Sequence, residues 1–159
     1  MLNHQTPKRR YKLVLLLVCM LPAFSYGSQL LSFQGKATDL DTSELLYIEN
    51  HRVILSEQGQ YLSAYVTYSN SDGHVFAEKT LDYAKSYLAP DMLFHDKRSD
   101  EHTRVFFNKT DNSLQVLIEG KNMRKESDIS LDEPVVVVDA GFDRLIDSRW
   151  DMLRKNKEI

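Results

Sequence analysis

Alternation of apolar and polar residues with a period of two is the feature that most constrains the fold of this chain. Between Tyr61 and Tyr68, Leu62, Ala64 and Val66 alternate with Ser63, Tyr65 and Thr67. Successive side chains of a strand point to opposite faces of a sheet, so this pattern predicts a strand with one face in the core. The same pattern predicts strands at residues 30–37, 45–55, 75–83, 103–109 and 114–119.

Short clusters of turn-forming residues separate these segments. They lie at residues 39–43, 57–59, 70–73 and 110–113. Links of this length join neighbouring antiparallel strands as hairpins. The sequence therefore predicts an α+β, mainly β domain, in which a curved antiparallel meander of about six strands, half-barrel or sandwich-like, packs on one C-terminal helix.

Two segments are predicted to interrupt the meander. Pro90 cannot donate to a ladder, so residues 87–91 predict a crossover, and the charged residues 123–133 predict a linker. Residues 135–138 then predict a buried strand. Apolar residues at helical spacing follow, which predicts a helix at about residues 140–157 with Trp150 packed against the sheet.

The first 27 residues have the pattern of an export signal. A basic segment at residues 8–12 precedes an apolar run at residues 13–21, and Ser25-Tyr26-Gly27 resembles a cleavage site. Cleavage would leave a single domain at residues 28–159, which we expect in the periplasm of a Gram-negative bacterium. A retained membrane anchor needs about 20 apolar residues, and a lipoprotein would be cut before Cys19; both alternatives fit this segment less well.

Removal of the leader would leave an acidic domain. All 23 acidic residues but only 16 of the 20 basic residues follow Gly27, which gives a net charge of −7. Nucleic-acid binding needs clustered Lys and Arg, so we expect no nucleic-acid partner. Cys19 is the only cysteine, so the expected domain also lacks thiol catalysis and disulfides.

Two acidic motifs have structural explanations. Asp39, Asp41 and Ser43 are spaced like ligands of a calcium loop, but Glu44 replaces the glycine at position six, so a hairpin turn fits better. Asp139 follows the segment predicted as a buried strand, where an active-site carboxylate can lie. Capping of the following helix explains that aspartate better.

Two histidines are the candidate metal ligands. His95 and His102 could face each other across a short hairpin that turns near residues 99–101, with Asp96 or Glu101 as a third ligand. The interpretation that we favour is a pair of exposed polar residues at a hairpin end. We accordingly expect no metal and no cofactor.

The remaining candidates are aromatic residues and histidines. The chain has no Gly-x-Ser-x-Gly motif, but His51, His74, His95 or His102 could join a carboxylate in a hydrolase site, which is one alternative function. Aromatic side chains on the predicted strands and helix could instead line an apolar site, although core packing is the commoner role. These candidate ligand-binding residues are Tyr61, Tyr65, Tyr68, Phe76, Tyr83 and Trp150.

Residues 37–47, 77–83 with 89–91, and 139–150 resemble a group of uncharacterised exported proteins of Gram-negative bacteria. The group has no established activity, so the resemblance implies export and assigns no catalytic residue. It also implies a shortened C-terminal end and an open sheet edge. We expect a non-enzymatic periplasmic binding protein that holds an apolar or lipid-like ligand, or a partner segment, between sheet and helix. A periplasmic hydrolase and a cell-envelope scaffold are the alternatives.

Overall fold

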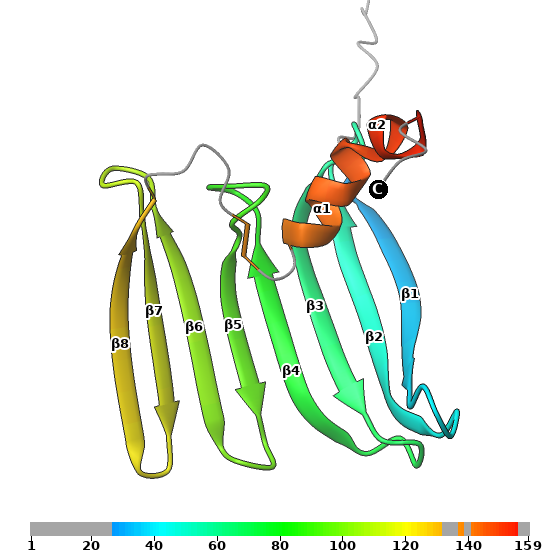
Figure 1. Ribbon diagram of the computed structural model, residues 1–159. Coiled ribbons are helices and arrows are strands. Elements are labelled where there is room, and N and C mark those ends of the chain that lie inside the picture. The colour runs from blue at the N-terminus through cyan, green and yellow to red at the C-terminus, as the bar shows by residue number, and fades with distance from the viewer. Residues whose placement is uncertain (1–26, 132–136, 139–140, 156–159) are drawn as a thin grey trace, which may run out of the picture.

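The computed structural model describes residues 27–131, 137–138 and 141–155. Within these residues, eight antiparallel strands form one open sheet in chain order (Figure 1). Two short helices, α1 (Gly141–Ser148) and α2 (Trp150–Lys155), lie near one end of it. The strands are β1 (Gln29–Thr38), β2 (Leu45–Leu55), β3 (Tyr61–Ser69), β4 (Val75–Asp82), β5 (Asp91–Asp96), β6 (Glu101–Asn108), β7 (Ser113–Gly120) and β8 (Met123–Ser130). The predicted mainly β antiparallel meander is confirmed.

The hairpin turns follow from local side-chain chemistry. Between β1 and β2, one carboxylate oxygen of Asp39 accepts hydrogen bonds from the amides of Asp41, at 3.0 Å, and Thr42, at 2.8 Å. Asp39 thereby closes a hairpin turn, as predicted. Gly59 and Gly73, in the next two turns, have φ angles of 76° and 84°, which glycine adopts without steric cost.

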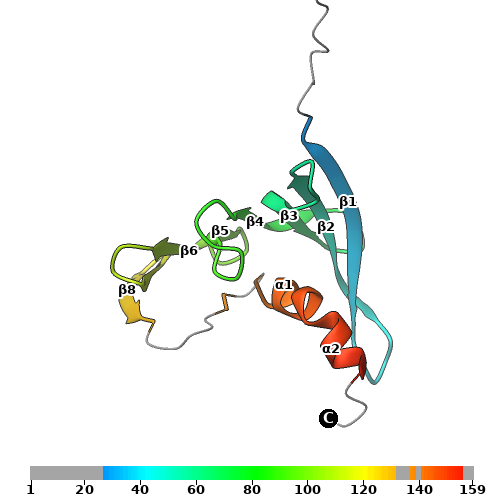
Figure 2. The same ribbon diagram turned by 90° about the horizontal axis from the view of Figure 1, so that it is seen from above.

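One row of apolar residues crosses the sheet and forms the centre of the core. Val53, Ala64, Leu81, Met92 and Val105 are opposite one another in the strand register, and all are buried. We call the face that carries this row the inner face. Seen from above, the sheet bends around α1 and α2, which lie on its concave side (Figure 2). Leu131 and Val138, from the described parts of the segment before α1, pack against the core of this face.

Two predictions about the strands were wrong. Residues 87–91 do not form a crossover, because β4 and β5 are adjacent antiparallel neighbours. Residues 123–133 are not a linker throughout, because Met123–Ser130 forms β8 and pairs with β7 along its whole length. The sheet consequently has two more strands than predicted.

The C-terminal segment also differs from its prediction. The single helix expected at residues 140–157 is broken at Arg149 into α1 and α2. Trp150 is 53% exposed and is not buried against the sheet. Of the strand predicted at residues 135–138, the described part, Val137 and Val138, is not in a strand, and the rest lies outside the described residues, as does Asp139.

The helices begin where the backbone of α1 meets the loop between β4 and β5. The amide of Val138 donates a hydrogen bond to the carbonyl oxygen of Leu88 at 3.0 Å. A Cβ atom at Gly141 would lie 1.7 Å from the same oxygen. Glycine at this position therefore permits the close approach. None of the helices in the described residues is long and apolar enough to cross a bilayer.

Candidate functional site

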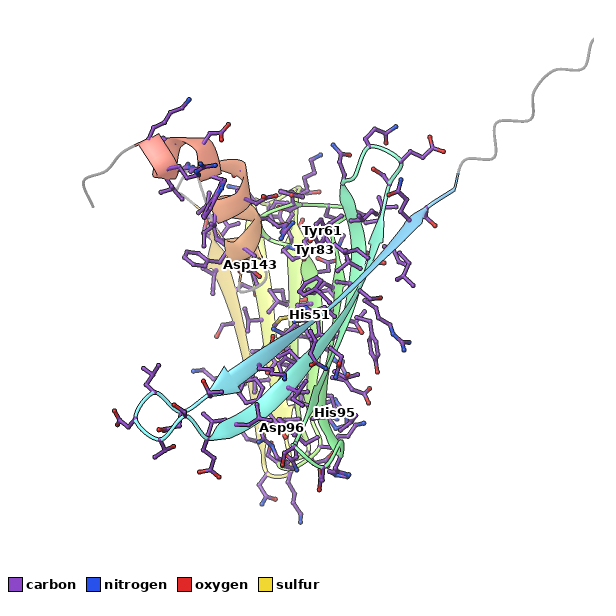
Figure 3. The ribbon with its side chains drawn as sticks, turned by 90° about the vertical axis from the view of Figure 1, so that its right-hand side faces the viewer. His51, Tyr61, Tyr83, His95, Asp96 and Asp143 are labelled. Atoms are coloured by element: carbon purple, nitrogen blue, oxygen red, sulfur yellow. The ribbon has the colours of Figure 1, made fainter. Side chains whose placement is uncertain are left out.

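A row of ionisable side chains crosses the opposite, outer face of the sheet. Glu78, His95, His102 and Glu119 are opposite one another on β4, β5, β6 and β7. Cross-strand neighbours of this kind have Cβ atoms roughly 5 Å apart, so their side chains can interact. Figure 3 places His95 at the end of the sheet that lies away from α1.

The two histidines in this row form a stacked pair. Their ring centroids are 4.0 Å apart and their planes are inclined by 11°. The predicted meeting of His95 and His102 across a hairpin is confirmed. A carboxylate oxygen of Asp100, in the turn between β5 and β6, lies 3.6 Å from Nε2 of His95 and 3.9 Å from Nε2 of His102.

The third member of this cluster is not one of the residues that we predicted. Asp96 and Glu101 are adjacent in sequence to His95 and His102, so strand alternation turns them to the inner face. Asp100 reaches the histidines from the turn, with a φ angle of 56°. A left-handed aspartate is uncommon but is tolerated better than most residues.

Contacts with β4 hold the turn in place. The amide of Lys97 donates a hydrogen bond to the carbonyl oxygen of Phe76 at 2.8 Å, and its ammonium group pairs with Glu78. The guanidinium carbon of Arg98 lies 3.9 Å from the centroid of the Phe76 ring. Hydrogen bonds from the Arg98 side chain also hold the pKa of Asp96 below its usual range. The turn that carries Asp100 is thus anchored on both sides of the sheet.

Glu78 and Glu119 at the ends of the row are paired with cations. The hydrogen bond from Lys97 holds the pKa of Glu78 below its usual range, with a further hydrogen bond from Tyr65. Burial and that same bond raise the pKa of Tyr65. One carboxylate oxygen of Glu119 accepts a hydrogen bond from the Arg124 guanidinium at 2.8 Å. The other carboxylate oxygen lies 3.6 Å from the Arg104 guanidinium. Both carboxylates therefore already have cationic partners beside the histidines.

The predicted aromatic ligand site is divided by the structure. Tyr61 and Tyr83 lie at the helix end of the sheet (Figure 3), with ring centroids 5.7 Å apart. Tyr68 lies farther along the inner face, with its ring centroid 6.4 Å from that of Phe76. Tyr65 is on the outer face beside Glu78, and Trp150 is exposed on α2. The six candidates do not line one cavity.

Tyr61 is on the inner face because the strand is irregular. The register between β2 and β3 shifts at Ile54/Leu55, so Leu62 is an extra residue. Such a bulge changes the alternation of side chains beyond it. The guanidinium of Arg144 from α1 then lies over the Tyr61 ring.

The other two histidines among the described residues lie apart from this cluster. On the inner face, Nε2 of His51 donates a hydrogen bond to a carboxylate oxygen of Glu49 at 2.9 Å, and the His51 ring stacks on Phe33 at a centroid distance of 4.4 Å. His74 is exposed in the turn before β4. The carboxylate of Glu49 could orient His51 as in a hydrolase site. A hydrolase would also need a nucleophile beside the histidine.

The two edges of the sheet differ in character. On β1, Leu30, Leu31 and Phe33 are exposed to 64%, 38% and 46%, and the strand contains a single charged residue, Lys36. β8 has four charged residues among eight: Arg124, Lys125, Glu126 and Asp128. Charged side chains are a common protection of an edge strand against further pairing. Among the described strands, β1 is therefore the less protected edge.

An open hollow of about 600 Å³ lies beside the β1 edge. Ser32 and Gln34 of β1 contribute to its wall, with residues from β2 and β3. Most of the lining residues carry polar groups, and the side-chain amide of Gln34 donates a hydrogen bond to Asn50 at 2.9 Å. A side chain arriving from outside β1 would find hydrogen-bonding partners here.

Comparisons with known proteins give no relative. No family model, no curated protein and no solved structure matches this chain.

Proposed function

We propose that this protein is a non-enzymatic binding protein of the bacterial periplasm that holds an extended segment of a partner protein along the free edge of β1. The observation that supports this most is the exposure of Leu30, Leu31 and Phe33 on an edge strand of ten residues. An edge strand presents unpaired N–H and C=O groups, and an extended peptide can pair with them as an additional strand.

The contrast between the edges supports β1 as the binding edge. Charges on β8 would disfavour an added strand, whereas β1 has neither proline nor an acidic residue. An edge strand with exposed apolar residues and few charges is a hazard for aggregation unless it has a partner. Binding of a partner there explains why the sequence tolerates such an edge.

The side chains around β1 indicate what the partner segment should contain. Leu31 and Phe33 share the inner face, so apolar residues at alternate positions of the partner could pack beside them. On the outer face, the hollow beside Ser32 and Gln34 could take a polar side chain. Main-chain hydrogen bonds would supply affinity, and these side-chain contacts would supply selectivity.

A second copy of this chain fits the edge less well. Two-fold antiparallel pairing about the middle of β1 would set Leu31 opposite Lys36 of the other copy. Cross-strand pairs contribute to sheet stability when their side chains match, and leucine with lysine does not. We therefore propose a different protein as the partner.

The aromatic residues favour a protein segment over a lipid-like ligand. Tyr61 contacts both Tyr83 and Arg144 where sheet and helix meet. Their mutual packing occupies the space in which an apolar molecule was expected. The edge, in contrast, is accessible without any movement of the helices.

Site-specific crosslinking in cells tests this proposal. A photoreactive amino acid at Leu30 on β1 should give a crosslinked product larger than the protein alone, whereas one at Ile129 on β8 should not. Ile129 is a matched control because it is also an exposed apolar residue on an edge strand. Equal products from both positions, a product with the mass of two copies, or none at Leu30 would contradict the proposal. Periplasmic release of the product tests the compartment separately.

A further inference from the structure

We propose that His95, Asp100 and His102 form a binding site for a zinc ion on the outer face of the sheet. One nitrogen from each imidazole and one oxygen from the Asp100 carboxylate lie within 4.8 Å of one another. The site is distinct from the β1 edge, because it lies on β5, β6 and their turn.

An unsatisfied imidazole nitrogen in this cluster supports the binding of a cation. Nε2 of His95 is buried and has no hydrogen-bond partner among the described residues. The Asp100 oxygen at 3.6 Å is too far for a hydrogen bond. A buried polar atom without a partner costs about 1–3 kcal/mol, so such atoms are uncommon in native folds. Coordination of a cation would satisfy this nitrogen.

The separations suit zinc after rotation of the imidazole side chains. Zinc binds histidine nitrogen at about 2.0–2.1 Å and carboxylate oxygen at a similar distance, usually in a tetrahedron. These bond lengths place neighbouring ligand atoms about 3.3 Å apart. The distances from the Asp100 oxygen to the two imidazole nitrogens are 3.6 and 3.9 Å. That oxygen needs to move by only tenths of an ångström, whereas the two stacked imidazoles must rotate so that their nitrogens, which lie within 4.8 Å of each other, point to one ion.

The backbone holds the donors near this arrangement. His95 and His102 are directly opposite in the β5–β6 register, and the turn between them is fixed by Lys97 and Arg98. Site rigidity matters because a loose turn would lose conformational entropy when it closed on an ion. The ordered hairpin reduces that cost.

The surroundings suit a cation with an open coordination position. Glu78 and Glu119 lie opposite the two histidines on the neighbouring strands, although Lys97 and Arg104 also face this region. Carboxylates beside histidine ligands commonly orient the imidazoles and favour metal binding. A hollow of about 200 Å³ on the outer face, lined by both histidines, gives solvent access. Three protein ligands would leave one position for water or another donor.

Titration of the full-length protein, made without a histidine tag, with zinc chloride tests this site. We expect one Zn²⁺ per chain by isothermal titration calorimetry, with no competition from Mg²⁺, which prefers oxygen ligands. His102→Gln and Asp100→Asn should each weaken binding by about tenfold or more. Both side chains are partly exposed, so these variants should fold. His74→Gln, at an exposed histidine in another turn, is the matched control and should bind as the parent does.

Imidazole NMR spectra identify the ligands independently of affinity. Zinc should shift the ring resonances of His95 and His102 and leave those of His51 and His74 in place. Binding that His102→Gln and Asp100→Asn leave unchanged, or zinc shifts at His51 or His74 instead, would overturn the proposal. Failure of the folded parent protein to bind zinc would overturn it as well.

Discussion

The guanidinium carbon of Arg144 lies 3.8 Å from the centroid of the Tyr61 ring, where α1 meets the sheet. The Arg144 side chain is only 16% exposed, and a carboxylate oxygen of Asp147 lies 3.8 Å away from its guanidinium. A cation over an aromatic face is more favourable when both are partly desolvated. This contact therefore contributes directly to holding the helices on the inner face.

Replacement of Arg144 by alanine should loosen the helices. We expect Arg144→Ala to lower the free energy of unfolding by about 1–2 kcal/mol, because it removes the cation–π contact and the packing of the arginine stem. Urea denaturation measures the change. Arg154→Ala, at an exposed position of α2, is the control and should change stability little. Equal effects of the two substitutions would refute a specific role for Arg144.

Alanine at position 141 should disturb the start of α1. The added Cβ would lie 1.7 Å from the carbonyl oxygen of Leu88, which is backbone and cannot turn aside. We expect Gly141→Ala to destabilise the protein by about 1–3 kcal/mol, as overpacking does. Gly120→Ala, whose Cβ would meet nothing within 4 Å, is the matched control. An unchanged denaturation midpoint for Gly141→Ala would contradict the close approach of the Gly141 and Leu88 backbones.

Ionisation of Tyr83 should reduce stability at alkaline pH. Burial raises the pKa of Tyr83 to about 12 from its ordinary value of 10.0, against a smaller opposing effect of Arg144. The folded state therefore holds this proton more tightly than the unfolded state does. The resulting stability is fully present below about pH 10 and is lost as the pH rises towards about 12. Comparison with Tyr83→Phe isolates the contribution of this hydroxyl group. The free energy of unfolding of the variant should fall less over this pH interval than that of the parent protein. An equal fall in both proteins would contradict a raised pKa of Tyr83.

The sequence predicts β1, β2, β3, β4, β6 and β7, and it misses β5 and β8. β8 is an edge strand exposed on both faces, so its charges give no period of two. β5 has only six residues and directly follows Pro90, which suggested a break. Pairing with neighbours already in the sheet stabilises both strands, and this tertiary effect has no local signal.

The histidine pair could be predicted, but its carboxylate could not. Turn residues between His95 and His102 predict a hairpin that brings the two rings together. Strict alternation would have excluded Asp96 and Glu101, because residues adjacent in a strand face opposite sides. The position of Asp100 depends on its left-handed φ angle of 56°, which the amino-acid pattern does not specify.

A positive charge on β1 should prevent partner binding without unfolding the protein. Leu30 is 64% exposed, so Leu30→Lys should change the free energy of unfolding by less than about 0.5 kcal/mol. The lysine should nevertheless disfavour an added strand, as charges on natural edges do. We expect crosslinks placed at Gln34 to disappear in Leu30→Lys and to persist in Ile129→Lys on β8. Persistence in both variants would argue against binding at β1.

Hydrogen exchange at the β1 amides tests the central proposal most directly. The measurement compares the protein alone with the protein isolated in complex with its crosslinked partner. An added strand forms main-chain hydrogen bonds with the free edge, so amides within Gln29–Thr38 should exchange more slowly in the complex, while those of β8 should not change. Unchanged exchange along β1, or new protection at β8 instead, would contradict partner binding by strand addition.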